Sequence, residues 1–224
     1  MSRVARAPLS LLARVLDYQR PLRRAVALEG PLAAAPVSLA FLTLCLMASL
    51  LWASPGAGHR LAAACCAYRG WRPGSWTGDG LRLAGSAFLL RHPGEVIWTI
   101  AATFLVVAPF EAMVGSRRML LVAVLGHVVP TLAVAVSGLS QVTRLGGGGL
   151  DVGASAVVVA LAAGLAVRAR SPAVAVCLVL AQAADIVLDT PLGAAEHLIA
   201  IGTGALVAAA LGAGIRLTRL GPVD

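Results

Sequence analysis

The chain has 224 residues, of which 59% are apolar and 12% are charged. A soluble domain has about 45–50% apolar and about 25% charged residues, so this composition excludes an ordinary soluble protein and indicates a polytopic membrane protein. The net charge of +8 comes from arginines at the ends of apolar runs without interleaved aromatic residues. We therefore expect no nucleic-acid partner and attribute the arginines to membrane anchoring.

The first 30 residues form a basic segment whose apolar pieces are interrupted by arginine too often for a signal peptide. We expect segment 1–30 to lie on the cytoplasmic surface of the membrane. Its apolar side chains would turn toward lipid, at Leu11, Leu12, Val15 and Leu16.

Six apolar runs follow this segment, and a membrane-spanning helix needs about 20 mostly apolar residues. They predict an all-α, polytopic membrane protein whose six-helix domain covers residues 31–216, before a short cytoplasmic tail at 217–224. The runs are 35–54, 94–114, 119–138, 152–167, 172–188 and 195–215.

The arginines also predict an orientation, because cytoplasmic loops of membrane proteins carry an excess of positive charge. All 18 basic residues are arginines. With both termini in the cytoplasm, twelve of them lie inside and six outside. The excess of arginine, alanine, glycine and valine is typical of GC-rich bacterial coding, so we expect the lipid bilayer of a bacterial inner membrane.

The four cysteines show neither metal-ligand spacing nor the framework of a disulfide-rich secreted protein. The sequence also contains no metal, nucleotide or haem motif. We therefore expect neither a metal nor a cofactor.

Two polar residues near the outer ends of apolar runs are candidates for function, because polar groups in a bilayer are costly. Ser155 lies near the beginning of the fourth run, and His197 near the beginning of the sixth. Counted from the inner residues Arg168 and Arg216, they stand at heights of about 20 and about 28 Å, at 1.5 Å per residue. Contact between them is a hypothesis, since helix tilt absorbs only part of that difference.

Small residues repeat every four positions on both of these runs, and such stripes let helices pack backbone to backbone. One stripe begins directly after Ser155, and the other begins one turn after His197. Packing them together would bring the two polar residues to one junction. The stripes are Ala156, Ala160 and Gly164, and Ala200, Gly204, Ala208 and Gly212.

A serine and a histidine at one junction form the minimum set for nucleophilic catalysis. The serine hydroxyl attacks a carbonyl when a base takes its proton, and neutral histidine is the usual base. Spacing alone leaves two other interpretations open. The serine could bond back to its own helix, and the histidine could be an interfacial side chain.

Several motifs, taken in order, resemble the rhomboid family of intramembrane serine proteases. Residues 153–156, Gly-Ala-Ser-Ala, are similar to the family's Gly-x-Ser-Gly nucleophile motif, with alanine in place of the second glycine. His197 followed by Gly204 is similar to the family's histidine and glycine on the sixth helix. Three weaker similarities are Leu81-Arg82 to a Trp-Arg pair, Phe110-Glu111 to a Leu-Glu pair, and residues 115–118, Gly-Ser-Arg-Arg, to a basic turn.

The resemblance implies a Ser155–His197 dyad in a water-filled cavity open to the outer face, which cleaves transmembrane segments of other proteins. The family offers a histidine and, four residues later, an asparagine to the oxyanion, whereas this chain has Glu95 and Thr99. Threonine can donate a hydrogen bond and ionised glutamate cannot. The oxyanion and cavity candidates are His92, Glu95, Thr99 and Gly153, with the backbone N–H of Ser155.

Two alternative functions stay open at this point. A catalytically inactive rhomboid-like protein would bind transmembrane helices of client proteins, and the Glu95 and Thr99 departure favours it. A small-solute transporter would use Gln182, Asp185 and Glu95 as a polar pathway, although the two halves show no inverted repeat. The sequence does not indicate an oligomeric state.

Other polar residues have structural roles in this interpretation. Asp151 is expected to cap the fourth helix, His127 to satisfy backbone groups freed by a nearby proline, and Glu111 to brace an inner helix end. Glu196 adjoins His197 but points about 100° away on a helix, so we expect no catalytic role for it.

Overall fold

The computed structural model describes residues 16–54, 76–90, 92–137, 153–188 and 191–219, together with residues 56, 58 and 60. Within these ranges the chain forms helices and no strand. The helices are η2 (Leu16–Gln19), α2 (Arg20–Glu29), α3 (Pro31–Ala34), α4 (Pro36–Ala53), α6 (Trp76–Ser86), α7 (Pro93–Ala102), η3 (Thr103–Val107), α8 (Ala108–Val114), α9 (Ser116–Val136), α11 (Ser155–Ala169), α12 (Pro172–Leu188) and α13 (Pro191–Arg219).

Four helical stretches in the described ranges are long and apolar enough to cross a membrane, which supports the prediction of an all-α membrane protein. Two further apolar helices are shorter, at Ser155–Ala169 and Pro172–Ala184. Each stretch coincides with one of the predicted apolar runs to within a few residues. The four long stretches are Pro36–Ala53, Pro93–Val114, Ser116–Val136 and Leu192–Gly212.

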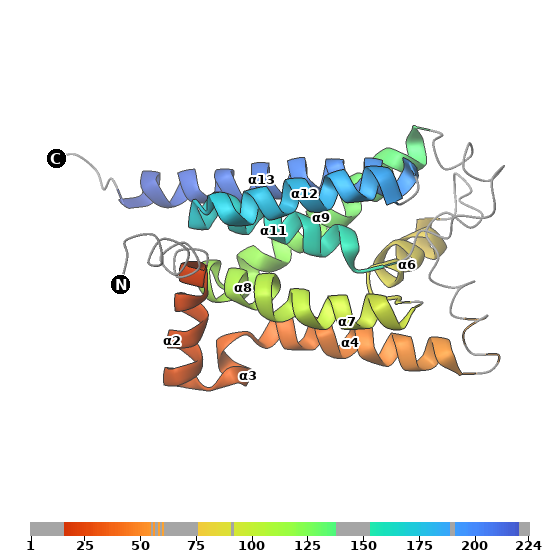
Figure 1. Cartoon of the computed structure of the whole chain (residues 1–224), viewed down its shortest axis with the longest axis horizontal. Coiled ribbons are helices and arrows are strands. Elements are labelled where there is room, and N and C mark those ends of the chain that lie inside the picture. Colours follow the sequence, from red (N-terminus) through yellow and green to blue (C-terminus); the bar gives the residue numbers. More distant parts are fainter. Residues whose placement is uncertain are drawn as a thin grey trace, which may run out of the picture.

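The long helices run side by side, whereas α2 lies across one end of the bundle (Figure 1). We call this the α2 end, and we call the opposite end, where α6 lies and α7, α11 and α13 begin, the α6 end. Helix α2 contains no buried residue, and Leu28 is 72% exposed. Residues 1–15, which include Leu11, Leu12 and Val15 of the predicted surface segment, lie outside the described ranges.

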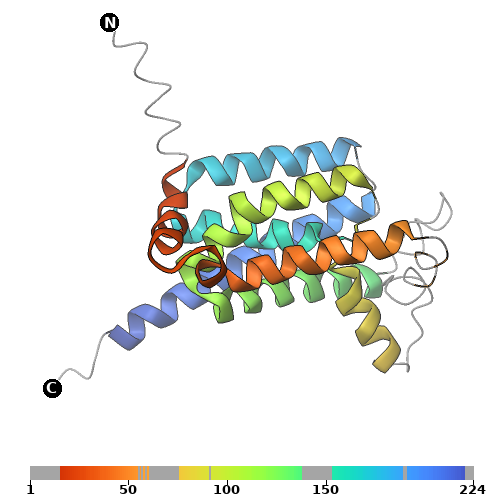
Figure 2. The same cartoon turned by 90° about the horizontal axis from the view of Figure 1, so that it is seen from below.

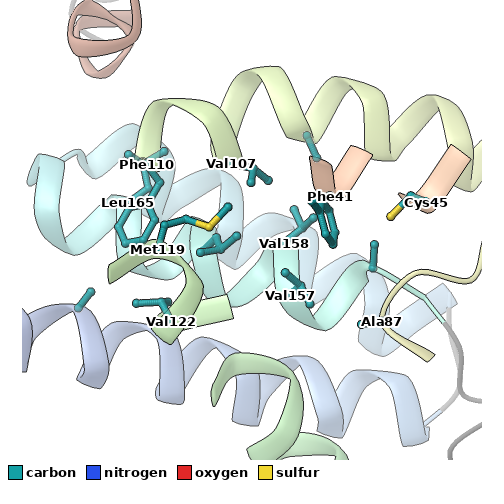
Figure 3. Packing of buried hydrophobic residues seen from close by; sticks show 14 of the residues in the cluster. Phe41, Cys45, Ala87, Val107, Phe110, Met119, Val122, Val157, Val158 and Leu165 are labelled. Carbon is teal, nitrogen blue, oxygen red and sulfur yellow. The ribbon is translucent and has the colours of Figure 1, made fainter. Parts of the chain in front are cut away.

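Helix α11 is the central helix of the bundle. It contacts α13, α9 and α12 as well as η3 and α8, and Figure 2 shows it (turquoise) among the other helices. All residues from Ala156 to Leu165 are buried. Figure 3 shows the core on one side of α11, where Val158 and Leu165 lie near Val107 and Phe110. Protein rather than lipid therefore covers this helix.

A buried carboxylate fixes the beginnings of α4 and α9. Glu111 is 2% exposed. It accepts hydrogen bonds from the N–H groups of Val37 at 3.1 Å and Ser38 at 2.7 Å, and from the hydroxyls of Ser38 and Ser116, both at 2.6 Å. All four partners are donors, and the two carboxyl oxygens have enough acceptor sites for all of them. Glu111 thus satisfies N–H groups that a helix beginning leaves unpaired.

The second long stretch contains a π turn, η3, which the hydrophobic pattern did not predict. Thr99, Thr103, Val107 and Glu111 are all buried. In a regular α-helix residues four apart drift steadily around the axis. A π turn has a longer hydrogen-bonded repeat, and it keeps these four residues facing the interior.

Helix α6 is attached to α9 through His127. The His127 Nε2 atom lies 2.7 Å from the Leu83 carbonyl oxygen and 3.1 Å from the Ser86 hydroxyl. The prediction that His127 satisfies backbone freed by the nearby proline is wrong for this nitrogen, because Nε2 faces another helix. The contact holds α6 against the interior of the bundle.

Candidate functional site

Ser155 is the first residue of α11, and α11 begins at the α6 end of the bundle (Figure 1). Gly153, two residues earlier, has a φ of +147°, a conformation that favours glycine. The Gly153 N–H donates to the Ser86 carbonyl oxygen at 2.8 Å, which attaches this turn to the last residue of α6. The half-buried Ser155 is therefore held between α6 and the interior.

The first turn of α11 offers backbone donors. Its first helical hydrogen bond runs from the Val158 N–H to the Ala154 carbonyl oxygen at 3.0 Å. The N–H groups of residues 155–157 precede that bond, and Ala154 at the N-cap position has no side-chain acceptor. These N–H groups carry the positive end of the helix dipole and suit a negatively charged oxygen. The predicted cap, Asp151, lies outside the described residues.

His197 lies near the beginning of α13 and is 9% exposed. It stands three residues before Ala200 and seven before Gly204, so the three residues share one face of the helix. Ala200 is fully buried and packs in one cluster with Ala156, Val159 and Ala160 of α11. His197 therefore lies on the side of α13 that faces α11.

Helices α11 and α13 cross where Gly204 lies against Ala160. A Cβ atom at Gly204 would lie 2.6 Å from the Ala160 carbonyl carbon, so a larger residue does not fit without a shift of the helices. Gly126 of α9 approaches the Ala160 side chain as closely. Toward the α2 end, a Cβ atom at Gly164 would lie 3.4 Å from the Ala208 Cβ atom. The two small-residue stripes lie against each other.

This crossing gives the relative heights of the two candidate residues. Ser155 lies five residues from Ala160 toward the α6 end, and His197 lies seven residues from Gly204 in the same direction. These separations correspond to about 7.5 and about 10.5 Å along the helices, so the heights differ by about 3 Å.

The difference of about 8 Å counted from the inner arginines is therefore too large. That count takes Arg168 and Arg216 to lie at the same height along the two helices. Instead, the Arg168 guanidinium lies beside Gly212, four residues before Arg216 on α13.

Ser155 and His197 thus lie at the same end of two contacting helices. Within the described ranges no hydrogen bond joins the Ser155 hydroxyl to the His197 ring, and His197 has an interaction of its own. Comparison with protein-family models, with curated proteins and with solved structures gives no match. The dyad and the rhomboid resemblance stay predictions that depend on this chain's own residues.

The three α7 candidates have different environments. Thr99 is fully buried, and its hydroxyl oxygen has no hydrogen-bond partner in the described part of the chain. Ala102, one turn later on the same face, belongs to the core cluster that includes Ala154. Thr99 and Ala102 therefore lie on the buried side of α7. Glu95 is half-buried with an interaction of its own, and His92 is exposed at the N-cap of α7.

Two further buried polar groups tie helices together near His197. Glu196 is 3% exposed and accepts a hydrogen bond from the Thr131 hydroxyl of α9 at 2.8 Å. Gln182 of α12 donates to the Ala194 carbonyl oxygen at 3.1 Å, and its side-chain oxygen is buried without a partner among the described residues. The side chain of Asp185 lies outside the described part of the structure.

Thr131 and Gly126 had no assigned role from sequence. Both lie in the third apolar run, where a threonine and a glycine interrupt otherwise larger apolar residues. That interruption is the sequence feature that could have drawn attention to Thr131 and Gly126. It could mark a packed helix face, but it could not name Glu196 or Ala160 as the partners.

Proposed function

We propose that this chain is a six-helix, rhomboid-type intramembrane serine protease in which Ser155 is the nucleophile and His197 the general base. The observation that carries the proposal is the Gly204–Ala160 crossing. It brings α11 and α13 backbone to backbone, and it leaves Ser155 and His197 about 3 Å apart in height. Catalytic hydrogen bonds are often long before substrate binds and tighten in the complex.

The proposed orientation puts the α6 end outside and the α2 end, with both termini, in the cytoplasm of a bacterial inner membrane. Exposed arginines gather at the α2 end, at Arg23, Arg24, Arg117, Arg118 and Arg170. This distribution fits the positive charge of cytoplasmic surfaces.

The length of α11 supports a site within the membrane. Its 15 residues span about 22 Å, less than the roughly 30 Å of the hydrocarbon core. If α11 ends at the cytoplasmic boundary, Ser155 lies about 8 Å below the outer boundary. A site at that depth reaches the peptide bonds of a transmembrane segment near its outer end.

The proposed reaction follows from the groups at this end of the bundle. His197 accepts the proton of the Ser155 hydroxyl while Oγ attacks the scissile carbonyl carbon. The first-turn N–H groups of α11 and the Thr99 hydroxyl donate to the oxyanion. The carbon–nitrogen bond breaks, and the leaving nitrogen takes the proton from His197. Water then hydrolyses the acyl-enzyme with His197 again acting as base.

Labelling with a fluorophosphonate probe tests the proposed nucleophile. We expect the detergent-purified wild type to be labelled, and both Ser155→Ala and His197→Ala to lose labelling, since an unactivated serine does not react. Ser54→Ala, which changes an exposed serine at the α6 end of α4, should be labelled like the wild type. A folded wild type that stays unlabelled would contradict the protease and favour the inactive, client-binding rhomboid-like protein.

A substitution at Thr99 separates catalysis from stability. Thr99→Val should lower the rate of probe labelling by a factor of about 10²–10³, the usual effect of losing one oxyanion donor. Its melting temperature should stay equal or rise, because the buried hydroxyl has no partner to lose. Thr43→Val, at an exposed threonine of α4, serves as the control and should change neither quantity. An unchanged labelling rate in Thr99→Val would remove Thr99 from the site.

A further inference from the structure

The structure contains an apolar groove between α4 and α9, and Ser155 is not among the residues that line it. Its volume is about 570 Å³. Its walls are the faces of α4 and α9 that include Ala40, Leu44, Ala123 and Val124, and α6 and the turn after it line it as well. His127 is the one ionisable side chain among the residues that line it. The groove lies between two helices long enough to span a membrane, so lipid is available to fill it.

The groove covers about half of the membrane thickness. Its lining extends along α4 from Pro36 to Leu44 and along α9 from Met119 to Val128. These stretches correspond to about 12 and about 13.5 Å of helix. One leaflet contributes about 15 Å of the roughly 30 Å hydrocarbon core. Along these two helices the groove therefore matches the length of one acyl chain from the leaflet at the α2 end, and α6 and Val157 of α11 line the groove toward the α6 end.

The end of the groove near the beginning of α9 has a positive charge. Arg117 stands three residues before Leu120 and seven before Val124, and both of these line the groove, so Arg117 continues the same helix face. It is exposed and makes no ion pair within the described ranges. The nearest carboxylate in sequence, Glu111, is buried and already receives four hydrogen bonds. An anionic group at the mouth would meet Arg117 without a competing partner.

We infer that this groove binds one anionic phospholipid of the leaflet at the α2 end. One acyl chain lies between α4 and α9, and the phosphate lies against the Arg117 guanidinium. Apolar side chains along one leaflet select a hydrocarbon chain, and the arginine at the level of the headgroups selects an anionic lipid. This site is independent of the Ser155 chemistry, and its test does not require activity.

Native mass spectrometry of the delipidated, full-length protein tests this site. The probes are phosphatidylglycerol and phosphatidylcholine with identical acyl chains. We expect the wild type to retain one phosphatidylglycerol, with an affinity about fivefold higher than for phosphatidylcholine, the factor that corresponds to one arginine near an anionic lipid. Arg117→Gln should remove this preference. Arg24→Gln, an exposed arginine of α2, should keep it.

Variants that fill the groove test whether the acyl chain binds there. Ala40→Phe and Ala123→Phe place a ring in the groove from opposite walls and should each abolish retention of the lipid. Leu121→Phe changes an exposed residue of α9 that does not line the groove and should retain it. Ala40 is exposed, so its substitution does not threaten the core. The inference would be overturned if the wild type bound both lipids with equal affinity, or if Ala40→Phe still retained the lipid. A dimer that excludes lipid from the groove would also overturn it.

Discussion

Replacing Glu111 with alanine should destabilise the folded bundle by about 2–6 kcal/mol. Two backbone N–H groups, of Val37 and Ser38, would lose their acceptor, and an unsatisfied buried donor costs roughly 1–3 kcal/mol. The hydroxyls of Ser38 and Ser116 would lose theirs as well. Because the carboxylate connects α8 to the beginnings of α4 and α9, the loss should weaken the whole α2 end. Thermal unfolding in detergent measures the effect.

Two controls make the Glu111 result specific. Glu29→Ala removes an exposed carboxylate of α2 near the same end and should change stability by less than about 0.5 kcal/mol. Glu111→Gln keeps the shape but offers one acceptor oxygen instead of two, so its effect should lie between those of the other two variants. Equal melting temperatures for Glu111→Ala and Glu29→Ala would show that the carboxylate does not hold these helices.

Gly204→Ala should separate α11 from α13 with a single methyl group. The added Cβ atom would lie 2.6 Å from the Ala160 carbonyl carbon and 2.7 Å from its Cα atom, so backbone rather than a flexible side chain must move. Overpacking of this kind typically costs about 1–3 kcal/mol. The shift also moves Ser155 away from His197, so probe labelling should fall together with the melting temperature.

Gly202→Ala is the matched control, because it makes the same change two residues earlier on α13. Gly202 is exposed, and a Cβ atom there would meet nothing within 4 Å. Alanine is a better helix former than glycine by about 1 kcal/mol, so this variant should be as stable as the wild type or more so. If Gly204→Ala behaves like Gly202→Ala, the close approach of the two helices is not required.

The helices were predictable, because their apolar runs are long and uniform and are separated by arginine, glycine and proline. The small-residue stripes also indicated which faces of the fourth and sixth runs approach each other. The relative heights were not predictable, because arginines mark where a helix leaves the membrane and do not report where two helices cross. That required the contact between Gly204 and Ala160.

Three other features were beyond sequence reasoning for a common physical reason. The π turn at η3 changes which residues face inward, yet its five residues, TFLVV, carry no local signal for it. The contacts of His127 with α6 and of Glu196 with Thr131 join segments far apart in the chain. A polar residue in an apolar run shows that a partner is needed. It does not show which segment supplies that partner.

The burial of α11 has a consequence for how the protein responds to bilayers of different thickness. Helices in contact with lipid adjust to a thicker or thinner bilayer by tilting. Helix α11 is enclosed by its neighbours, so its position follows the bundle and not the lipid. In the proposed orientation, a thicker bilayer would thus raise the lipid surface above Ser155 while its contacts stay the same. Membrane thickness would then control how far water must travel to reach this residue.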